Sequence, residues 1–315
     1  STEAAKAVPI VCPGHSRPLA EVFFSPVTED GVFLISACLD KMPMMRNGSN
    51  GDWIGTFEGH KGAVWSAQLN ADATLAVTGS ADFSAKLWDA TTGDVMHSWD
   101  HRHIVKSVTF SHSGDKVATG GKDRTLRVFK VGAPGEAPTT LEVPSPITRV
   151  VFLPGDARLV VALESGKLLT VSVADMAVES EVALDGEIKD VELSRDETVL
   201  TVAAGKDVHF LSVPSMEEIK VHKLAFSKVA SASLHPNKDI FVAGGSDMWV
   251  YVYDFATGKQ LECNKGHHGP VHCVRFSPDG KLYASGADDG TIRLWTVSEG
   301  KHAATTEAGA AAGEA

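Results

Sequence analysis

Cysteine is scarce in this 315-residue sequence, which contains only Cys12, Cys38, Cys263 and Cys273 and no Cys-x-x-Cys pair. A disulfide scaffold of this length would carry more cysteines, so we expect a protein of a reducing compartment. Long hydrophobic runs are also absent, since no apolar stretch approaches the length of about 18 residues that a membrane span needs. Residues 1–9 lack the basic and apolar segments of a signal peptide. The sequence therefore predicts neither membrane insertion nor secretion.

Basic residues are outnumbered, with 29 Lys and Arg against 40 Asp and Glu and a net charge of −11. This charge repels a phosphate backbone, so direct nucleic-acid binding would need a local basic patch. The motifs GxGxxG, GxxxxGK(S/T), HExxH and GxSxG are also missing. We therefore expect no enzymatic activity, no cofactor and no metal. The hydrophobic share of 43% is nevertheless sufficient for a sizeable folded core.

What the sequence does contain is an internal repeat. Gly-His pairs at Gly14-His15, Gly59-His60 and Gly266-His267 each precede a β-rich run, a polar turn and a strand of small residues. A histidine and an aspartate lie 22 positions apart in three repeats and 25 apart in the first, in the pairs His60 and Asp82, His101 and Asp123, His267 and Asp289, and His15 and Asp40. Repeats recur about every 42 residues, and a divergent unit over residues 182–213 brings their number to seven.

The repeated unit determines the expected fold. Each unit contains short apolar runs separated by turn signals, and no segment has strong helical periodicity. A four-stranded unit cannot bury both faces alone, so we predict an all-β fold, a seven-bladed β-propeller with four-stranded antiparallel blades. Residues 8–11 are expected to add the outer strand that closes the last blade. Residues 1–301 would form this single domain, and the Ala/Gly-rich residues 302–315 a disordered tail.

The succession of Gly-His, about 22 residues, Asp and then Trp88-Asp89 resembles the signature of the WD-repeat family. Within the repeats, histidine, hydroxyl and carboxylate imitate a hydrolytic triad, but a triad is needed only once, whereas this set recurs with the blade period. We interpret it as a structural hydrogen-bonded set. The sets are His60, Thr78, Asp82 and Trp88; His101, Thr119 and Asp123; His267, Ser285, Asp289 and Trp295; and His15, Ser36 and Asp40. Blades 4 to 6 lack the full set, so we expect apolar packing to hold them.

A cluster near the C-terminus offers zinc ligands, namely Cys263, His267, His268, His272 and Cys273. We favour a structural interpretation, because His267 already belongs to a blade set and adjacent strand residues point to opposite faces. A basic cluster lies on one blade and consists of Lys122, Arg124, Arg127 and Lys130. For this cluster we favour a solvated strand face.

The WD-repeat resemblance also implies which residues border the mouth of the central channel. They are the residue five positions after the histidine and the residue before the aspartate. The position five residues after the histidine holds Trp65, Lys106 and His272, and Lys189 stands at the equivalent place of a repeat without the histidine. The position before the aspartate holds Lys122 and Asp288. A tryptophan among lysines is typical of a binding hot spot for an acidic or mixed peptide. The alternative is that Trp65 packs under a loop.

Longer stretches give a closer resemblance, over Phe33–Asp40, Gly51–Trp65, His103–Lys106, Ser231–Pro236 and Lys265–Cys273. They are similar to the family of serine-threonine kinase receptor-associated proteins, also called unr-interacting proteins. The resemblance implies a cytoplasmic scaffold, with the nucleus as a second location, in the SMN complex that supports spliceosomal snRNP assembly and mRNA splicing. It implies Gemin subunits and a cold-shock-domain RNA-binding protein as partners, with receptor kinases and Smads of TGF-β signalling as further ones.

The same resemblance implies a monomer within a larger complex that meets RNA only indirectly. An alternative resemblance is to the i subunit of translation initiation factor three, a sister propeller that shares the Gly-His-x-Gly-Ala-Val-Trp segment ending at Trp65. It would make the protein a scaffold in translation initiation.

Overall fold

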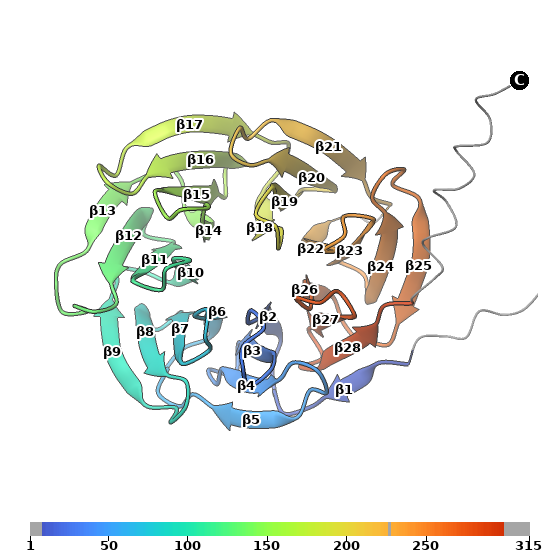
Figure 1. The fold of residues 1–315 in the computed structure, drawn as a ribbon, viewed down its shortest axis with the longest axis horizontal. Coiled ribbons are helices and arrows are strands. Elements are labelled where there is room, and N and C mark those ends of the chain that lie inside the picture. Colours follow the sequence, from blue (N-terminus) through green and yellow to red (C-terminus); the bar gives the residue numbers. More distant parts are fainter. Residues whose placement is uncertain (1–7, 226–227, 299–315) are drawn as a thin grey trace, which may run out of the picture.

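The structure, a computed structural model, describes residues 8–225 and 228–298. These residues form 28 β-strands and no helix. The strands make seven four-stranded antiparallel sheets, which stand as blades around a central axis (Figure 1). The predicted seven-bladed β-propeller is therefore confirmed. The expected tail at residues 302–315 lies outside the described residues, as do residues 1–7 and 299–301 of the expected domain.

Each blade contributes one strand to each of four concentric positions. The inner strands of blades 1 to 7 are β2 (Leu19–Phe24), β6 (Val64–Leu69), β10 (Val105–Phe110), β14 (Ile147–Phe152), β18 (Ile188–Leu193), β22 (Val229–Leu234) and β26 (Val271–Phe276). The second strands are β3 (Phe33–Cys38), β7 (Leu75–Ser80), β11 (Lys116–Gly121), β15 (Arg158–Leu163), β19 (Val199–Ala204), β23 (Ile240–Gly245) and β27 (Leu282–Ala287). The third strands are β4 (Met44–Asn47), β8 (Ser84–Asp89), β12 (Thr125–Lys130), β16 (Lys167–Ser172), β20 (Asp207–Ser212), β24 (Trp249–Asp254) and β28 (Ile292–Thr296). The outer strands are β5 (Trp53–Thr56), β9 (Val95–Asp100), β13 (Thr139–Glu142), β17 (Val178–Ala183), β21 (Glu218–Lys223), β25 (Gln260–Lys265) and β1 (Ile10–Cys12).

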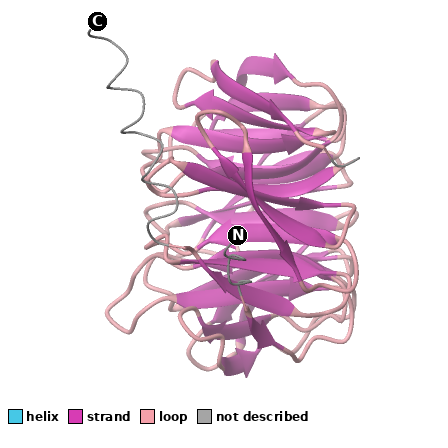
Figure 2. Cartoon of the chain, turned by 90° about the vertical axis from the view of Figure 1, so that its right-hand side faces the viewer, coloured by secondary structure: helices cyan, strands magenta, loops and turns pink. Residues whose placement is uncertain are grey.

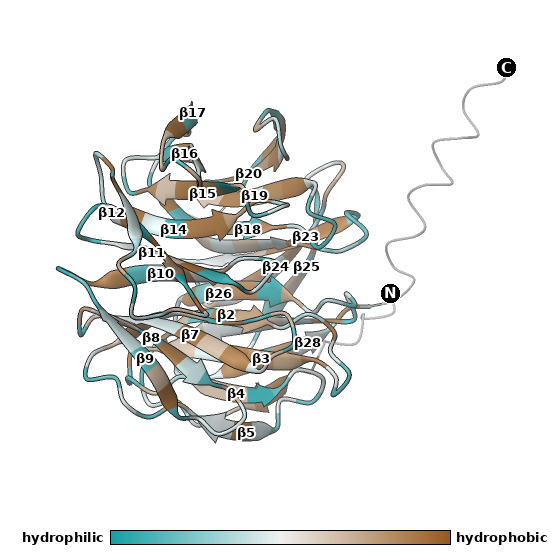
Figure 3. Cartoon of the chain, turned by 60° about the vertical axis from the view of Figure 1, so that its left-hand side comes forward, coloured by the Kyte–Doolittle hydropathy of each residue, from teal (hydrophilic) through white to brown (hydrophobic). Residues whose placement is uncertain are grey.

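Two loop-bearing faces result from this repeated topology, with the strands running between them (Figure 2). We call the face where the inner strands begin the histidine face, because the Gly-His loops lead into those strands. The opposite face, where the inner strands end, is called the cavity face. Hydrophobic colour is concentrated on the strands and hydrophilic colour on many of the loops (Figure 3).

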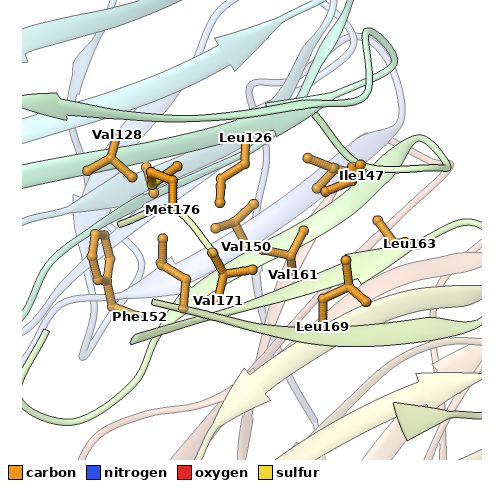
Figure 4. Close-up of a cluster of buried hydrophobic side chains, with 13 residues drawn as sticks. Leu126, Val128, Ile147, Val150, Phe152, Val161, Leu163, Leu169, Val171 and Met176 are labelled. Carbon is orange, nitrogen blue, oxygen red and sulfur yellow. The ribbon is translucent and has the colours of Figure 1, made fainter. Parts of the chain in front are cut away.

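The core lies between neighbouring blades. Buried side chains of β12 pack against those of β14, β15 and β16, so that one apolar cluster joins blades 3 and 4 (Figure 4). Close approach depends on small residues in the second strands, since a Cβ on Gly120 would lie 2.5 Å from Cγ2 of Ile147 in the next blade. Comparable clusters join the other neighbouring blades, those with the full histidine set and those without it alike. Apolar burial between blades is therefore the principal stabilising term.

The ring closes where β1 pairs antiparallel with β28, with Ile10 opposite Leu294 and Cys12 opposite Ile292. The N-terminal segment thus supplies the outer strand of blade 7, as predicted, although the strand covers residues 10–12 and not 8–11. Cys12 is buried against Leu294 in the cluster that also contains residues of blade 1. Gly51 of blade 1 approaches the same thiol, so this contact couples the first and last blades.

We expect Gly51→Ala to lower the free energy of unfolding by about 1–3 kcal/mol. Gly51 has a φ of 78°, which strains alanine, and its Cβ would overlap Sγ of Cys12. Urea unfolding provides the measurement. Gly55→Ala in the neighbouring β5 is the control, because a Cβ there meets nothing within 4 Å, and it should stay within about 0.5 kcal/mol of wild type. Equal losses in both variants would contradict a role for this contact in closing the ring.

Candidate partner-binding face

The histidine sets connect the loops of the histidine face to the blades beneath them. In blade 2, Nδ1 of His60 lies 2.8 Å from Oδ2 of Asp82 and Nε2 lies 2.7 Å from Oγ1 of Thr78. A carboxylate only accepts, so Nδ1 carries the proton and Nε2 accepts from the hydroxyl. The indole of Trp88 then donates to the same hydroxyl oxygen at 2.8 Å. Thr78 therefore joins histidine and tryptophan, which do not bond each other directly.

Blade 7 repeats this geometry. Nδ1 of His267 lies 3.1 Å from Oδ2 of Asp289, its Nε2 lies 2.7 Å from Oγ of Ser285, and the indole of Trp295 donates to that oxygen at 2.8 Å. Burial alone would raise the pKa of Asp289, but hydrogen bonds from backbone N–H groups and from Thr291 lower it to about 2. The carboxylate is thus ionised at neutral pH, in agreement with its role as acceptor.

Blade 1 contains the histidine, the hydroxyl and the carboxylate of the set but no tryptophan. His15 lies 2.8 Å from both Asp40 and Ser36, while Arg46 occupies the place of the tryptophan and donates to the carbonyl oxygen of Gly51 at 3.1 Å. His15, Cys38 and Asp40 have ligand atoms within 4.8 Å of one another, as a metal site would. However, burial raises the pKa of the Cys38 thiol to about 12, and the thiol donates to backbone carbonyls. The group fits a turn cap better than a metal site.

The same position in blade 2 supports this interpretation of Cys38. There Ser80 donates to the carbonyl of Gly62 at 3.0 Å and accepts from the backbone N–H of Asp82 at 3.1 Å. The thiol of Cys38 makes the same two kinds of contact, including one from the N–H of Asp40 at 3.4 Å. Cysteine thus replaces a serine in a repeated turn.

In blade 3 the predicted contact between His101 and Asp123 is wrong. His101 bonds Thr119 at 2.8 Å as expected, but its Nδ1 lies 3.0 Å from the carbonyl oxygen of Trp99 and not on Asp123. Asp123 instead forms an ion pair with Arg127 at 2.8 Å. Two differences explain this: Asp100 precedes His101 where the other copies have glycine, and a guanidinium is a stronger partner for a carboxylate than a neutral imidazole.

The interpretation of the basic cluster as a solvated strand face is wrong for Arg127, which forms the ion pair with Asp123. Arg127 is only 9% exposed, so it does not lie on a solvated strand face, whereas Arg124 and Lys130 are exposed and Lys122 is half-buried. The pair with Asp123 compensates the buried charge of Arg127.

The C-terminal histidines and cysteines do not converge on one point. His267 bonds Asp289 and Ser285, whereas Nε2 of His272 lies 2.7 Å from Asp288 at the channel mouth. Cys273 is buried, with its thiol 3.8 Å from the carbonyl oxygen of Gly286. Burial raises the pKa of this thiol to about 12, which disfavours the thiolate that a metal would require.

Trp65 and Lys106 form the centre of the histidine face. Each is the second residue of its inner strand, in β6 and β10, and Nζ of Lys106 lies 3.1 Å from the centre of the Trp65 ring. Both side chains are half-buried, and the indole N–H of Trp65 has no hydrogen-bond partner among the described residues. Burial, together with the nearby charges of Arg149 and Lys122, lowers the pKa of Lys106 to about 7.

The other predicted channel-mouth residues lie on the same face in local ion pairs. Lys122 pairs with Glu164 of the next blade. Lys189 pairs with Glu187 at 2.6 Å, and His272 with Asp288 at 2.7 Å. The face is therefore a mosaic of matched charges around one aromatic and ammonium pair, and it is less basic than the sequence suggested. Such a mosaic can recognise a partner surface of mixed charge.

Residues of the channel wall were missed by the sequence analysis. Six of the seven residues at the third position of the inner strands are polar, namely Glu21, Ser66, Ser107, Arg149, Asp190 and Ser231. Glu21, Asp190 and Arg149 belong to an ionic network across the channel. A polar residue repeated at one position of an apolar strand was the signal that could have identified them.

Taken together, the fold and the repeated sets define a WD-repeat β-propeller, a class of protein whose loop faces serve as an interaction scaffold. The WD domain, G-beta repeat family matches residues 51–89, 93–130, 216–254 and 258–296. Serine-threonine kinase receptor-associated protein of Gallus gallus is 46% identical over 302 residues, which span 95% of this chain and 85% of the relative. The protein of the same description from Dictyostelium discoideum is 46% identical over 290 residues, 91% of this chain and 98% of the relative.

The chain belongs to this serine-threonine kinase receptor-associated family of WD-repeat proteins. Eukaryotic translation initiation factor 3 subunit I of Drosophila melanogaster is 29% identical over 318 residues, with 91% of this chain and 96% of that protein covered. No helix in the described part of the chain has the length and apolarity to cross a membrane.

Replacement of Thr78 by valine is expected to lower the free energy of unfolding by about 2–4 kcal/mol, because it leaves buried groups of His60 and Trp88 without partners. Thr201→Val is the matched control, since the Thr201 hydroxyl is buried and bonds none of the described residues. It should be neutral or stabilising. Urea unfolding of both variants measures the difference, and a neutral T78V would show that the set contributes nothing.

His101 should make stability depend on pH. Burial, together with Arg127, lowers its pKa to about 4, so between about pH 6.5 and 4 the unfolded state binds more protons than the folded state. Stability is therefore lost as the pH falls, by about 2 kcal/mol between pH 7 and 5. Urea unfolding at both pH values should show this loss reduced by that amount in His101→Gln. An unchanged pH dependence in the variant would contradict a buried, neutral His101.

Proposed function

We propose that this protein is a non-enzymatic scaffold of an SMN-type complex and supports spliceosomal snRNP assembly through protein contacts on its histidine face. The observation that carries the proposal is the 46% identity to receptor-associated proteins over nearly the whole propeller. The partners proposed from the family resemblance are Gemin subunits and a cold-shock-domain RNA-binding protein. The protein acts as a monomer within that complex, in the cytoplasm and in the nucleus.

The contact centre in this proposal is the pair of Trp65 and Lys106, surrounded by Lys122, Lys189 and the pair of His272 with Asp288. The ammonium group over the ring of Trp65 can pair with a partner carboxylate, and the half-buried indole offers an unused N–H at its edge to a partner carbonyl. The net charge of −11 and the matched ion pairs favour protein over RNA as the direct partner. RNA is therefore reached through the partner proteins.

Two further roles extend the proposal. The relatives are named for association with a serine-threonine kinase receptor. Receptor kinases and Smads of TGF-β signalling are therefore proposed as additional partners. The alternative function is that of a scaffold in translation initiation, which the 29% identity to an initiation factor subunit supports less strongly than the 46% identity supports the first.

Affinity capture of the tagged protein from cell extract, followed by mass spectrometry, tests the proposal. Wild type should recover Gemin and Sm proteins, and Trp65→Ala or Lys106→Glu should reduce that recovery at least about tenfold, as expected for a hot spot. Trp249→Ala and Lys265→Glu are matched controls, because Lys265 lies 3.9 Å from the Trp249 ring at the periphery of the same face. These controls should bind like wild type.

Other results of the same capture decide between the candidates. Recovery of initiation-factor subunits in place of Gemin and Sm proteins would overturn the proposal in favour of the alternative. Equal loss in the central and peripheral variants would remove the assignment to Trp65 and Lys106.

A further inference from the structure

An ionic network crosses the central channel and joins blades that are distant along the chain. Arg275 of β26 donates to the two carboxylate oxygens of Asp190 of β18 at 2.6 and 2.8 Å. Arg149 of β14 donates to the same carboxylate at 3.1 Å and lies 3.9 Å from Glu21 of β2. Asp190 is 1% exposed, and its contacts with the two arginines hold its pKa well below the usual range although burial raises it.

The donors of the arginines in this network are already engaged. Nη1 of Arg275 also donates to the carbonyl of Val274 at 2.7 Å and to Ser231 at 3.0 Å. Nη1 of Arg149 lies 3.5 Å from the carbonyl of Lys106. An anion entering the channel would therefore find Arg275 committed and Arg149 held by Asp190, and it would meet the charge of Glu21 and Asp190.

A cavity of about 580 Å³ lies on the cavity-face side of this network. Glu21, Arg149, Glu192 and Arg275 line it, together with the last residues of the inner strands and the turns that follow them, such as Asn70-Ala71. Phenyl rings also line it, those of Phe23, Phe24, Phe110, Phe152 and Phe276. Only Phe23 among these rings is half-buried, because the other four belong to the apolar clusters between blades. The cavity thus combines a charged lining with one partly accessible aromatic ring, and it opens opposite to the face that carries Trp65.

Glu192 of β18 is a carboxylate of this lining with one buried oxygen that has no hydrogen-bond partner among the described residues. Its Oε1 accepts from Ser233 at 3.1 Å and lies 3.6 Å from Nε of Arg275. Its Oε2 is buried and has no hydrogen-bond partner among the described residues. The carboxylates of Glu21, Asp190 and Glu192 outnumber the guanidinium groups of Arg149 and Arg275, so the unmatched group in the network is an acceptor.

We propose that this cavity binds an arginine side chain of a protein partner, inserted from the cavity face, with the guanidinium donating to Oε2 of Glu192. A cation is selected because the unmatched group is an acceptor. Arginine fits better than lysine, because a guanidinium is more weakly hydrated, stacks on aromatic rings and can donate to several acceptors at once. The site lies apart from the Trp65 surface, so one propeller can hold two partners.

Fluorescence anisotropy with a fluorescein-labelled Gly-Gly-Arg-Gly-Gly peptide tests the site on the full chain. Wild type should bind this peptide at least tenfold more tightly than the citrulline or lysine peptides. Glu192→Gln, which keeps the side-chain shape, should reduce the affinity at least tenfold without lowering the melting temperature, because it removes a carboxylate whose burial opposes ionisation. Ala71→Trp, at an exposed position of the mouth, should block entry without touching the network. Lys265→Glu, at the periphery of the opposite face, is the control and should bind like wild type.

Dependence on pH provides a second measurement. Burial raises the pKa of Glu192 to about 7, against the lowering effects of Arg275 and the Ser233 hydrogen bond. A cationic ligand requires the ionised carboxylate, so affinity should rise about tenfold from pH 6 to pH 8. The other charged groups facing Glu192 across the channel are Glu21, Asp190 and Arg149. The contacts with the arginines hold the pKa of Asp190 well below its usual range, and the carboxylates of Glu21 and Asp190 raise that of Arg149, so neither Asp190 nor Arg149 titrates over this range.

His112 is a histidine in the lining of the same cavity, so His112→Gln is the control and should keep the rise in affinity. The rise should disappear in Glu192→Gln. Equal binding of the citrulline peptide, lysine binding as tight as arginine binding, an unaffected E192Q variant or the absence of binding to wild type would each overturn the proposal.

Discussion

Burial of both faces of every blade is the constraint on which this structure depends. A four-stranded antiparallel sheet with two apolar faces is stable only when a neighbour covers each face. In a line of seven blades the first and last would each expose one face, and the closed ring removes that exposure. The pairing of β1 with β28 and the packing of Cys12 near Gly51 complete the closure, because they join the start of the chain to its last blade.

Polar residues are placed around this apolar framework in two different ways. Blades 1, 2 and 7 bind their loops through histidine, hydroxyl and carboxylate, as His60, Thr78 and Asp82 do. Blades 4 and 5 lack that set, yet they supply Arg149 and Asp190 to the network in the channel. The first arrangement shapes the histidine face, and the second separates that face from the cavity on the other side. One propeller thereby presents two chemically different surfaces, an aromatic and ammonium pair on one and a carboxylate with a free acceptor on the other.

The histidine sets could be predicted from the sequence because their spacing is periodic and their partners lie within one blade. Asp123 shows the limit of this reasoning. Its position in the repeat is correct, but the nearby Arg127 is charged and competes successfully with His101. Trp65 and Lys106 were placed on the correct face, but their direct contact was not predicted, because it joins two blades. The number of residues between them carries no information on how two side chains pack across that boundary.

The sequence by itself determined the number of blades and their four-stranded antiparallel form, since these follow from a repeat of about 42 residues and from the short apolar runs and turn signals within each repeat. Only the tertiary structure decided which charges meet in the channel. Asp190 and Arg275 are 85 positions apart, and neither local propensity nor repeat position pairs them. They meet because ring closure brings the inner strands around one axis, where burial excludes water and requires each charge to find a partner of opposite sign.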